Sequence, residues 1–148
     1  MKRFLLILPI VAAGYFGWTQ YRQSQVWDNQ VPGRIEATGD AECARALETR
    51  ASGVQVQGQG TVTKILADDN EGSRHQRFLV KLRSGQTLLV AHNIDIASRI
   101  SSLRVGDTIE FNGEYEWNAK GGVIHWTHHD PGGRRAGGWL KHANQTYQ

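Results

Sequence analysis

Apolar and polar residues alternate with a period of two along most of the chain after residue 54, which predicts β-strands that each bury one face. The alternation is clearest in TIEFNGEYEWN, residues 108–118, where apolar and mostly acidic positions exchange at every step. It also runs through VQVQGQGTVTKIL (54–66), RHQRFLVKLR (74–83) and TLLVAHN (87–93). VIHWTHHD (123–130) is predicted as the last strand, and Pro131 with the glycines after it ends the pattern.

One segment between these strands has a helical spacing instead. In IDIASRISSL, residues 94–103, the apolar residues Ile96, Ile100 and Leu103 recur at i, i+4 and i+7. Three strands, a helix and two strands is the order of an OB-fold. The chain is therefore predicted to be mainly β, with a five-stranded OB-like barrel over residues 54–130 and one helix between strands 3 and 4. A five-stranded SH3-like barrel is the alternative, but it normally lacks a helix at this place.

The N-terminal residues follow a different pattern. Lys2 and Arg3 precede an apolar stretch that continues to Trp18, so residues 1–21 are predicted to form a hydrophobic helix that is a signal anchor or a signal peptide. An anchor that spans the inner membrane through residues 4–21 is favoured, because the apolar character continues past the small residues at which cleavage could occur. The body would then be a periplasmic, or otherwise extracytoplasmic, domain.

The two segments that flank the barrel have their own predictions. Residues 22–53 are expected to be a polar connector with one short helix that begins after Asp40, and the tail 131–148 is expected to dock on the barrel through Trp139 and Leu140. The formal net charge is +3, but acidic and basic residues nearly balance within the barrel segment, which weakens a broad nucleic-acid-binding face. Cys43 is the single cysteine and cannot form an internal disulfide.

The predicted topology brings scattered histidines to one rim of the barrel. If the SGQ loop, residues 84–86, joins strands 2 and 3 with Arg83 opposite Thr87, His75 lies close to HNID (92–95). In an OB-fold the third strand also runs beside the fifth, so HNID would lie beside HWTHHD, residues 125–130.

Three functions compete for this rim. The first is binding of a polar oligomer, an oligonucleotide or a glycan, by polar and aromatic side chains: Arg74, Arg77, His92, Asn93, His125, Trp126, His128 and His129. The second is a divalent metal such as zinc, with ligands drawn from His75, His92, His125 and His129. The third is hydrolysis, as a hydrolase or nuclease in which His75 and Asp95 are catalytic. For any single residue, hydrogen bonding to loop backbone is an equally good explanation.

Four stretches resemble a known family when they are taken in order. RHQRF, HNID, GEYEWN and HWTHHDP, followed by GWLKH, are similar to an uncharacterised bacterial family known only as a domain of unknown function. The resemblance covers about residues 54–147 and implies a secreted or anchored protein with an OB-like fold. It implies no activity and no site residues.

Overall fold

The computed structural model describes the chain from Pro32 to Gln148, with side chains described from Gly39. Glu36–Gln148 forms one compact unit. The elements are α2 (Pro32–Thr49), β1 (Val54–Ile65), β2 (His75–Lys81), β3 (Thr87–Asn93), β4 (Thr108–Glu116), β5 (Val123–His125), β6 (Trp139–His142) and β7 (Gln145–Tyr147). The hydrophobic helix predicted within residues 1–21 lies outside the described residues. In the part of the chain that the structure describes, no helix is both long and apolar enough to cross a membrane.

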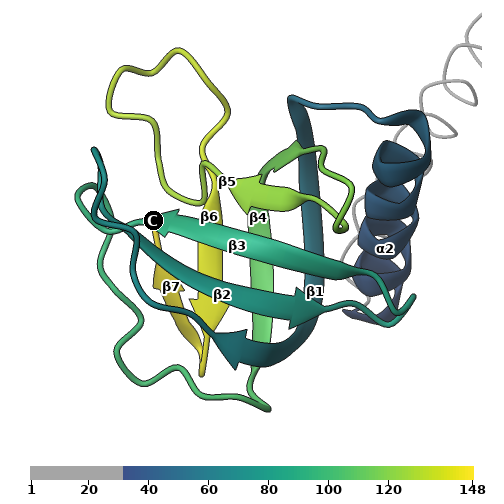
Figure 1. The fold of residues 1–148 in the computed structure, drawn as a ribbon, viewed down its shortest axis with the longest axis horizontal. Coiled ribbons are helices and arrows are strands. Elements are labelled where there is room, and N and C mark those ends of the chain that lie inside the picture. Colours follow the sequence, from purple (N-terminus) through teal and green to yellow (C-terminus); the bar gives the residue numbers. More distant parts are fainter. Residues whose placement is uncertain (1–31) are drawn as a thin grey trace, which may run out of the picture. The chain divides into compact units, whose positions relative to one another are not determined.

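Five strands close into a barrel in the order β1-β2-β3-β5-β4, with β1 and β4 paired to complete the circle (Figure 1). The pairing of β3 with β5 is parallel, and the other pairings of the barrel are antiparallel. This confirms the prediction of a mainly β chain with a five-stranded barrel. The strand order is consistent with an OB-like fold.

The alternating pattern places one face of each strand in the core. Burial in β4 alternates along the strand, so that Ile109, Phe111 and Tyr115 are fully buried. Burial alternates in β2 as well, where Phe78 and Val80 are fully buried. Burying an aliphatic or aromatic side chain of this size contributes about 1.5–3 kcal/mol, so the shared inward face holds the barrel closed.

The helix predicted between strands 3 and 4 is absent, and this part of the prediction is wrong: residues 94–103 form turns and irregular chain. The reason is a contact from a distant strand. The buried side chain of Gln76 donates to the Ile100 carbonyl (3.0 Å) and accepts from the Ile100 backbone N–H (2.9 Å), which occupies the groups that a helix would use. Ile96 is 39% exposed whereas Ile100 is buried, so the helical spacing does not form one face.

Helix α2 lies before the barrel and is longer than predicted. Asp40 is inside the helix rather than before it, and its carboxylate accepts a hydrogen bond from the backbone N–H of Ser84 (2.8 Å). Cys43 and Ala46 belong to the hydrophobic core. Burial is the main cause that raises the pKa of the Cys43 thiol to about 12, with Asp40 and Glu42 adding to it, so this thiol stays protonated and unreactive.

Two details of strands 2, 3 and 5 also differ from prediction. Thr87 lies opposite Lys81 rather than Arg83, because the hairpin closes through the bond from Leu82 N–H to the Gln86 carbonyl (2.9 Å). The pairing register of β2 and β3 is therefore shifted by two residues, and an even shift leaves each side chain on the face of the sheet that was predicted for it. β5 ends at His125 and does not continue to Asp130, because Trp126 has a φ of +52°, which a strand does not accept.

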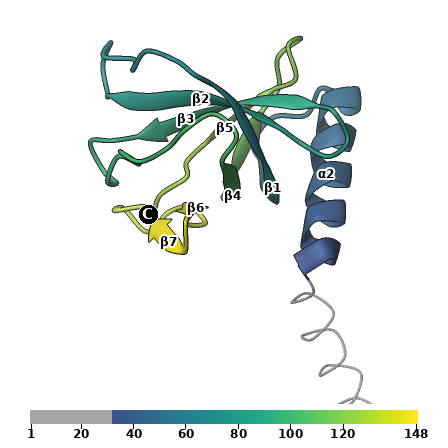
Figure 2. The same ribbon diagram turned by 90° about the horizontal axis from the view of Figure 1, so that it is seen from below.

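The C-terminal residues form two further strands on the barrel. β6 pairs with the first half of β4, and β5 pairs with its second half, so the two share one edge of β4. The long loop between them, residues 126–138, extends from the end of β5 (Figure 1). β7 pairs with β6, and both views show α2 and β7 on opposite sides of the barrel (Figures 1 and 2).

Gly138, where the loop returns to β6, allows a close approach of backbones. A Cβ at this position would lie 2.0 Å from the Trp126 carbonyl oxygen and 2.6 Å from that of Asn112. We expect Gly138→Ala to lower the free energy of unfolding by about 1–3 kcal/mol, because two backbone segments must move. Gly137→Ala is the matched control, since its nearest contact is 3.6 Å away. Denaturant unfolding that gives equal values for both variants would contradict this packing.

Candidate functional site

Charged and aromatic side chains gather where β4 meets β5 and the loop that follows. We call Glu114, Glu116, His125, Trp126 and Arg135 the β4–β5 cluster. Glu114 lies directly opposite His125 in the antiparallel pairing, and one carboxylate oxygen is 3.6 Å from His125 Nε2. The other oxygen of Glu114 accepts from Arg135 Nη1 (2.8 Å), and the Arg135 guanidinium lies 4.6 Å from the centre of the Trp126 ring. The cluster thus joins two strands and the loop.

The imidazole of His125 is neutral near pH 7. Burial lowers its pKa more than Glu114 and Glu116 raise it, and Arg135 and His75 lower it further. Its Nε2 atom is buried and has no hydrogen-bond partner among the residues that the structure describes. An imidazole nitrogen in this state is an unused donor or acceptor that faces a carboxylate, and such groups are uncommon in folded proteins.

Trp126 is held in a strained backbone conformation. A bulky residue with φ of +52° costs on the order of 1–3 kcal/mol, and such strain is concentrated at functional sites. The half-buried indole contacts the Arg135 guanidinium and a tilted His128 ring, whose centre is 5.3 Å away. The surroundings therefore fix both the backbone and the ring of Trp126.

His92 is a buried structural histidine. Its Nδ1 is 2.7 Å from the Thr127 hydroxyl, and its Nε2 is 3.2 Å from the Ser98 carbonyl oxygen. Burial lowers its pKa to about 4, against a weaker opposing effect of the Ser98 carbonyl. Both ring nitrogens are occupied, so His92 joins β3 to the segments on either side and has no free atom for a ligand or a metal.

The residues predicted around Asp95 form a local ion-paired turn. The Asp95 carboxylate accepts from the backbone N–H of Arg74 and from its Nε, each at 2.7 Å, and these bonds hold the pKa of Asp95 below its usual value. Asn93 accepts from the Asp95 backbone N–H (2.9 Å). Within residues 39–148, no hydrogen bond joins Asp95 to His75, but His75 lies close enough to help lower the pKa of Asp95, and the catalytic role of the two stays a prediction.

The remaining predicted residues are divided between surface and interior. Arg77 donates to the Ala67 carbonyl (3.1 Å) and lies 3.9 Å from the Asp69 carboxylate. His128 is buried, with Nδ1 2.7 Å from the His129 carbonyl oxygen, and His129 itself is exposed.

The structure therefore brings His125, Trp126 and His128 together, and His75 lies close enough to lower the pKa of both His92 and His125. Sequence reasoning missed Glu114, Glu116 and Arg135. A signal existed for the two glutamates, since the alternation placed them on the outward face of a strand that neighbours the fifth strand in an OB-fold. No sequence pattern pointed to Arg135.

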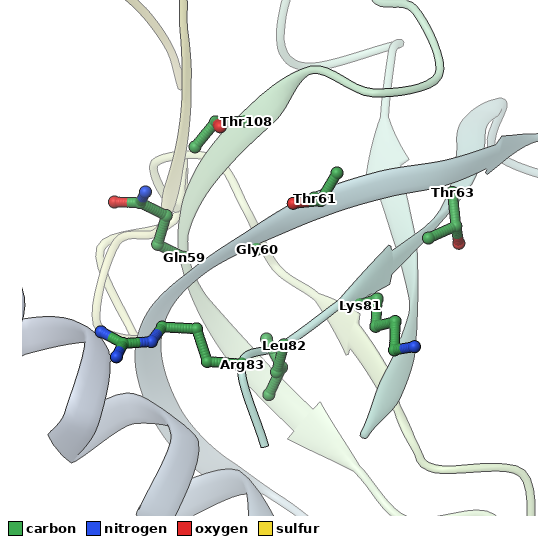
Figure 3. Close-up of a pocket in the computed structure, with 8 residues that line it drawn as sticks. All are labelled: Gln59, Gly60, Thr61, Thr63, Lys81, Leu82, Arg83 and Thr108. Carbon is green, nitrogen blue, oxygen red and sulfur yellow. The ribbon is translucent and has the colours of Figure 1, made fainter. Parts of the chain in front are cut away.

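A separate pocket of about 260 Å³ lies over β1, the end of β2 and the start of β4 (Figure 3). It is lined by Gln59, Gly60, Thr61, Thr63, Lys81, Leu82, Arg83 and Thr108. None of these is a residue predicted for the histidine-rich rim, so the pocket and the β4–β5 cluster are two different surfaces.

These features define the class of the protein: a closed five-stranded barrel, consistent with an OB-like fold, that carries a mixed-charge cluster beside a strained tryptophan. The chain belongs to the family described as "Protein of unknown function (DUF3465)", whose model matches residues 23–148. This confirms the resemblance to an uncharacterised family. No curated protein matches the chain.

Proposed function

We propose that this domain is an extracytoplasmic binding module for a polar ligand, and that the ligand is a glycan rather than an oligonucleotide. The observation that carries the proposal is the β4–β5 cluster. In it, a tryptophan in a strained backbone conformation contacts the Arg135 guanidinium, which is paired with the Glu114 carboxylate. Strained backbone of this kind is concentrated at functional sites, which supports a role for the cluster in binding.

The chemistry of the cluster suits sugars. Sugar hydroxyl groups both donate and accept hydrogen bonds, and the cluster offers carboxylate acceptors from Glu114 and Glu116 beside the donor Arg135. The Trp126 indole adds a rigid apolar surface with a polar edge, which suits the apolar face of a pyranose ring. A few polar groups around an aromatic side chain are the usual composition of a small-molecule site.

The same charges disfavour an oligonucleotide. Phosphate binding needs cations that are free to neutralise it. Four arginines of the barrel and its loops already have carboxylate partners: Arg74 with Asp95, Arg77 with Asp69, Arg99 with Asp68 and Arg135 with Glu114. The two glutamates of the cluster would in addition repel a phosphate backbone.

The proposed location outside the cytoplasm depends on the N-terminal residues. Lys2 and Arg3 followed by an apolar stretch support insertion into the inner membrane, with the charged end inside. Protease treatment of spheroplasts tests this: the body is expected to be digested without lysis, and protection until lysis would contradict it.

A hydrolase or nuclease is the second candidate, and one observation favours it. His125 is neutral near pH 7 and lies beside the Glu114 carboxylate, and a neutral imidazole is a suitable general base. Incubation of the full chain with glycans, DNA and RNA, with and without EDTA, separates the two functions. Turnover that EDTA abolishes would favour a metal-dependent enzyme, and binding without turnover would favour the module.

Replacing Trp126 is the sharpest test of glycan binding. We expect the full chain in mild detergent to bind oligomers of N-acetylglucosamine or soluble peptidoglycan fragments, and Trp126→Ala to weaken that binding roughly tenfold or more, because a central aromatic contact is lost. Calorimetric titration measures both. A short single-stranded DNA is the competing probe, and tighter binding of the DNA than of any glycan would contradict the ligand class.

Two variants serve as controls for this titration. Trp139→Ala removes another half-buried tryptophan that also lies beside a cation, Lys141, at 4.5 Å. Lys81→Met alters the pocket of Figure 3. Both are expected to bind as the wild-type chain does. A loss confined to Lys81→Met would place the ligand in the pocket and contradict the proposed site.

A further inference from the structure

We propose that Glu114, Glu116 and His125 bind one divalent transition-metal ion of the zinc type. This set shares only His125 with the four histidines that the sequence suggested as ligands. It goes beyond the proposed glycan binding and does not depend on it.

The first support is the geometry of the three side chains. One ligand atom of each lies within 4.8 Å of the other two. Zinc binds imidazole nitrogen and carboxylate oxygen at about 2.0–2.2 Å, so ligand atoms around it are roughly 3.3 Å apart. The pair formed by His125 Nε2 and Glu114 is already at 3.6 Å. Glu116 is exposed, so its side chain is free to move the remaining distance.

The second support is a buried imidazole nitrogen, His125 Nε2, that has no hydrogen-bond partner among the described residues. The carboxylate that this nitrogen faces is itself an acceptor. A second carboxylate, Glu116, stands beside them. In the tautomer that carries its proton on Nδ1, Nε2 is an acceptor, so three acceptors converge there and a cation at their centre makes every contact attractive.

The third support is the partner of Glu114. One of its oxygens faces His125, while the other accepts from Arg135, which stacks on Trp126. Residues that bind metals are usually oriented by such outer hydrogen bonds. Arg135 would fix the carboxylate in place without occupying the oxygen that faces the ion.

The ligand types indicate the class of ion. Imidazole nitrogen favours zinc and its neighbours over magnesium and calcium, which prefer oxygen ligands alone. Three protein ligands would leave a coordination position open, as in zinc sites that exchange water or bind an external group.

Calorimetric titration of the full chain with Zn²⁺ tests the site after removal of metals with EDTA and dialysis. We expect one Zn²⁺ per chain, bound more tightly than Mg²⁺ or Ca²⁺. Glu116→Gln and His125→Gln are each expected to weaken that binding at least about tenfold. Glu110→Gln, which changes an exposed glutamate on the same strand, should bind zinc as the wild-type chain does.

Glu116→Gln is the decisive variant, because its side chain is exposed and the substitution preserves size, so folding is unaffected. Circular dichroism checks this. Absence of stoichiometric zinc in the wild-type chain would overturn the site, and so would unchanged affinity in Glu116→Gln, which would place zinc on other histidines. No sugar is present in this titration, so its failure leaves glycan binding untouched, and the reverse also holds.

Discussion

Lowering the pH from about 7 to about 4 is expected to reduce the free energy of unfolding by about 3 kcal/mol through His92 alone. Its pKa is about 4 in the folded chain, against 6.5 for an ordinary histidine. The unfolded chain therefore takes up a proton between these values and the folded chain does not, so stability is complete above pH 6.5 and falls as the pH approaches 4. Burial of the imidazole is the main cause, and the hydrogen bond to the Ser98 carbonyl opposes it only weakly.

Denaturant unfolding at several pH values measures this effect. His92→Gln removes the titrating group, so the difference between the variant and the wild-type chain isolates His92 from His125, whose pKa is also lowered. His129→Gln, which removes an exposed histidine from the loop after β5, is the matched control for the substitution itself. The pKa values of Asp95, Asp107 and Asp130 are lowered by hydrogen bonds to their carboxylates, so their contributions are lost as the pH falls through the ordinary aspartate range and below it. Parallel curves for wild type and His92→Gln would contradict the buried neutral state.

Replacing Gln76 by alanine is expected to destabilise the chain by roughly 3–5 kcal/mol. The substitution leaves the Ile100 N–H without a partner and its carbonyl with only the long bond from the Leu103 N–H (3.5 Å), and it opens space in the core. Thermal or denaturant unfolding reports the loss. Gln76→Glu keeps an acceptor for the Ile100 N–H but buries a carboxylate opposite the Ile100 carbonyl oxygen, so near neutral pH it is expected to destabilise the chain at least as much as alanine does.

An exposed glutamine provides the comparison for Gln76. Gln55 makes one side-chain hydrogen bond, to Asn112 at 2.6 Å, and Gln55→Ala is expected to change stability by less than about 1 kcal/mol. Similar losses for the two alanine variants would show that the Gln76 contacts do not hold residues 94–103 in place.

The strands of the barrel were predictable because their signal is local. Alternation in residues 108–118 alone predicts which side chains of β4 are buried. The alternating segments after residue 54 predict the strands of the barrel in the same way. The helix over residues 94–103 was mispredicted because its outcome depends on Gln76, which is far away in sequence. A sign of this was present, since Gln76 shares the inward face of Phe78 and Val80 and a buried amide requires partners.

The candidate site was predictable only in part, and for the same reason. The topology correctly placed HNID near HWTHHD, where His92 now contacts Thr127, but whether a histidine is buried or available depends on packing that no pattern encodes. Trp126 ends β5 through its backbone conformation, so His128 and His129 lie in the loop that follows rather than in the predicted strand. Arg135 reaches Glu114 only because the 126–138 loop returns along β4.

The most direct test of ligand binding at the β4–β5 cluster is a nuclear magnetic resonance titration of the isotope-labelled full chain with N-acetylglucosamine oligomers. The indole N–H of Trp126 and the backbone amides of Glu114, His125 and Arg135 report the cluster, while those of Lys81 and Arg83 report the pocket of Figure 3. Saturable shifts confined to the cluster are the predicted result. Shifts confined to the pocket, or none at any concentration, would contradict it.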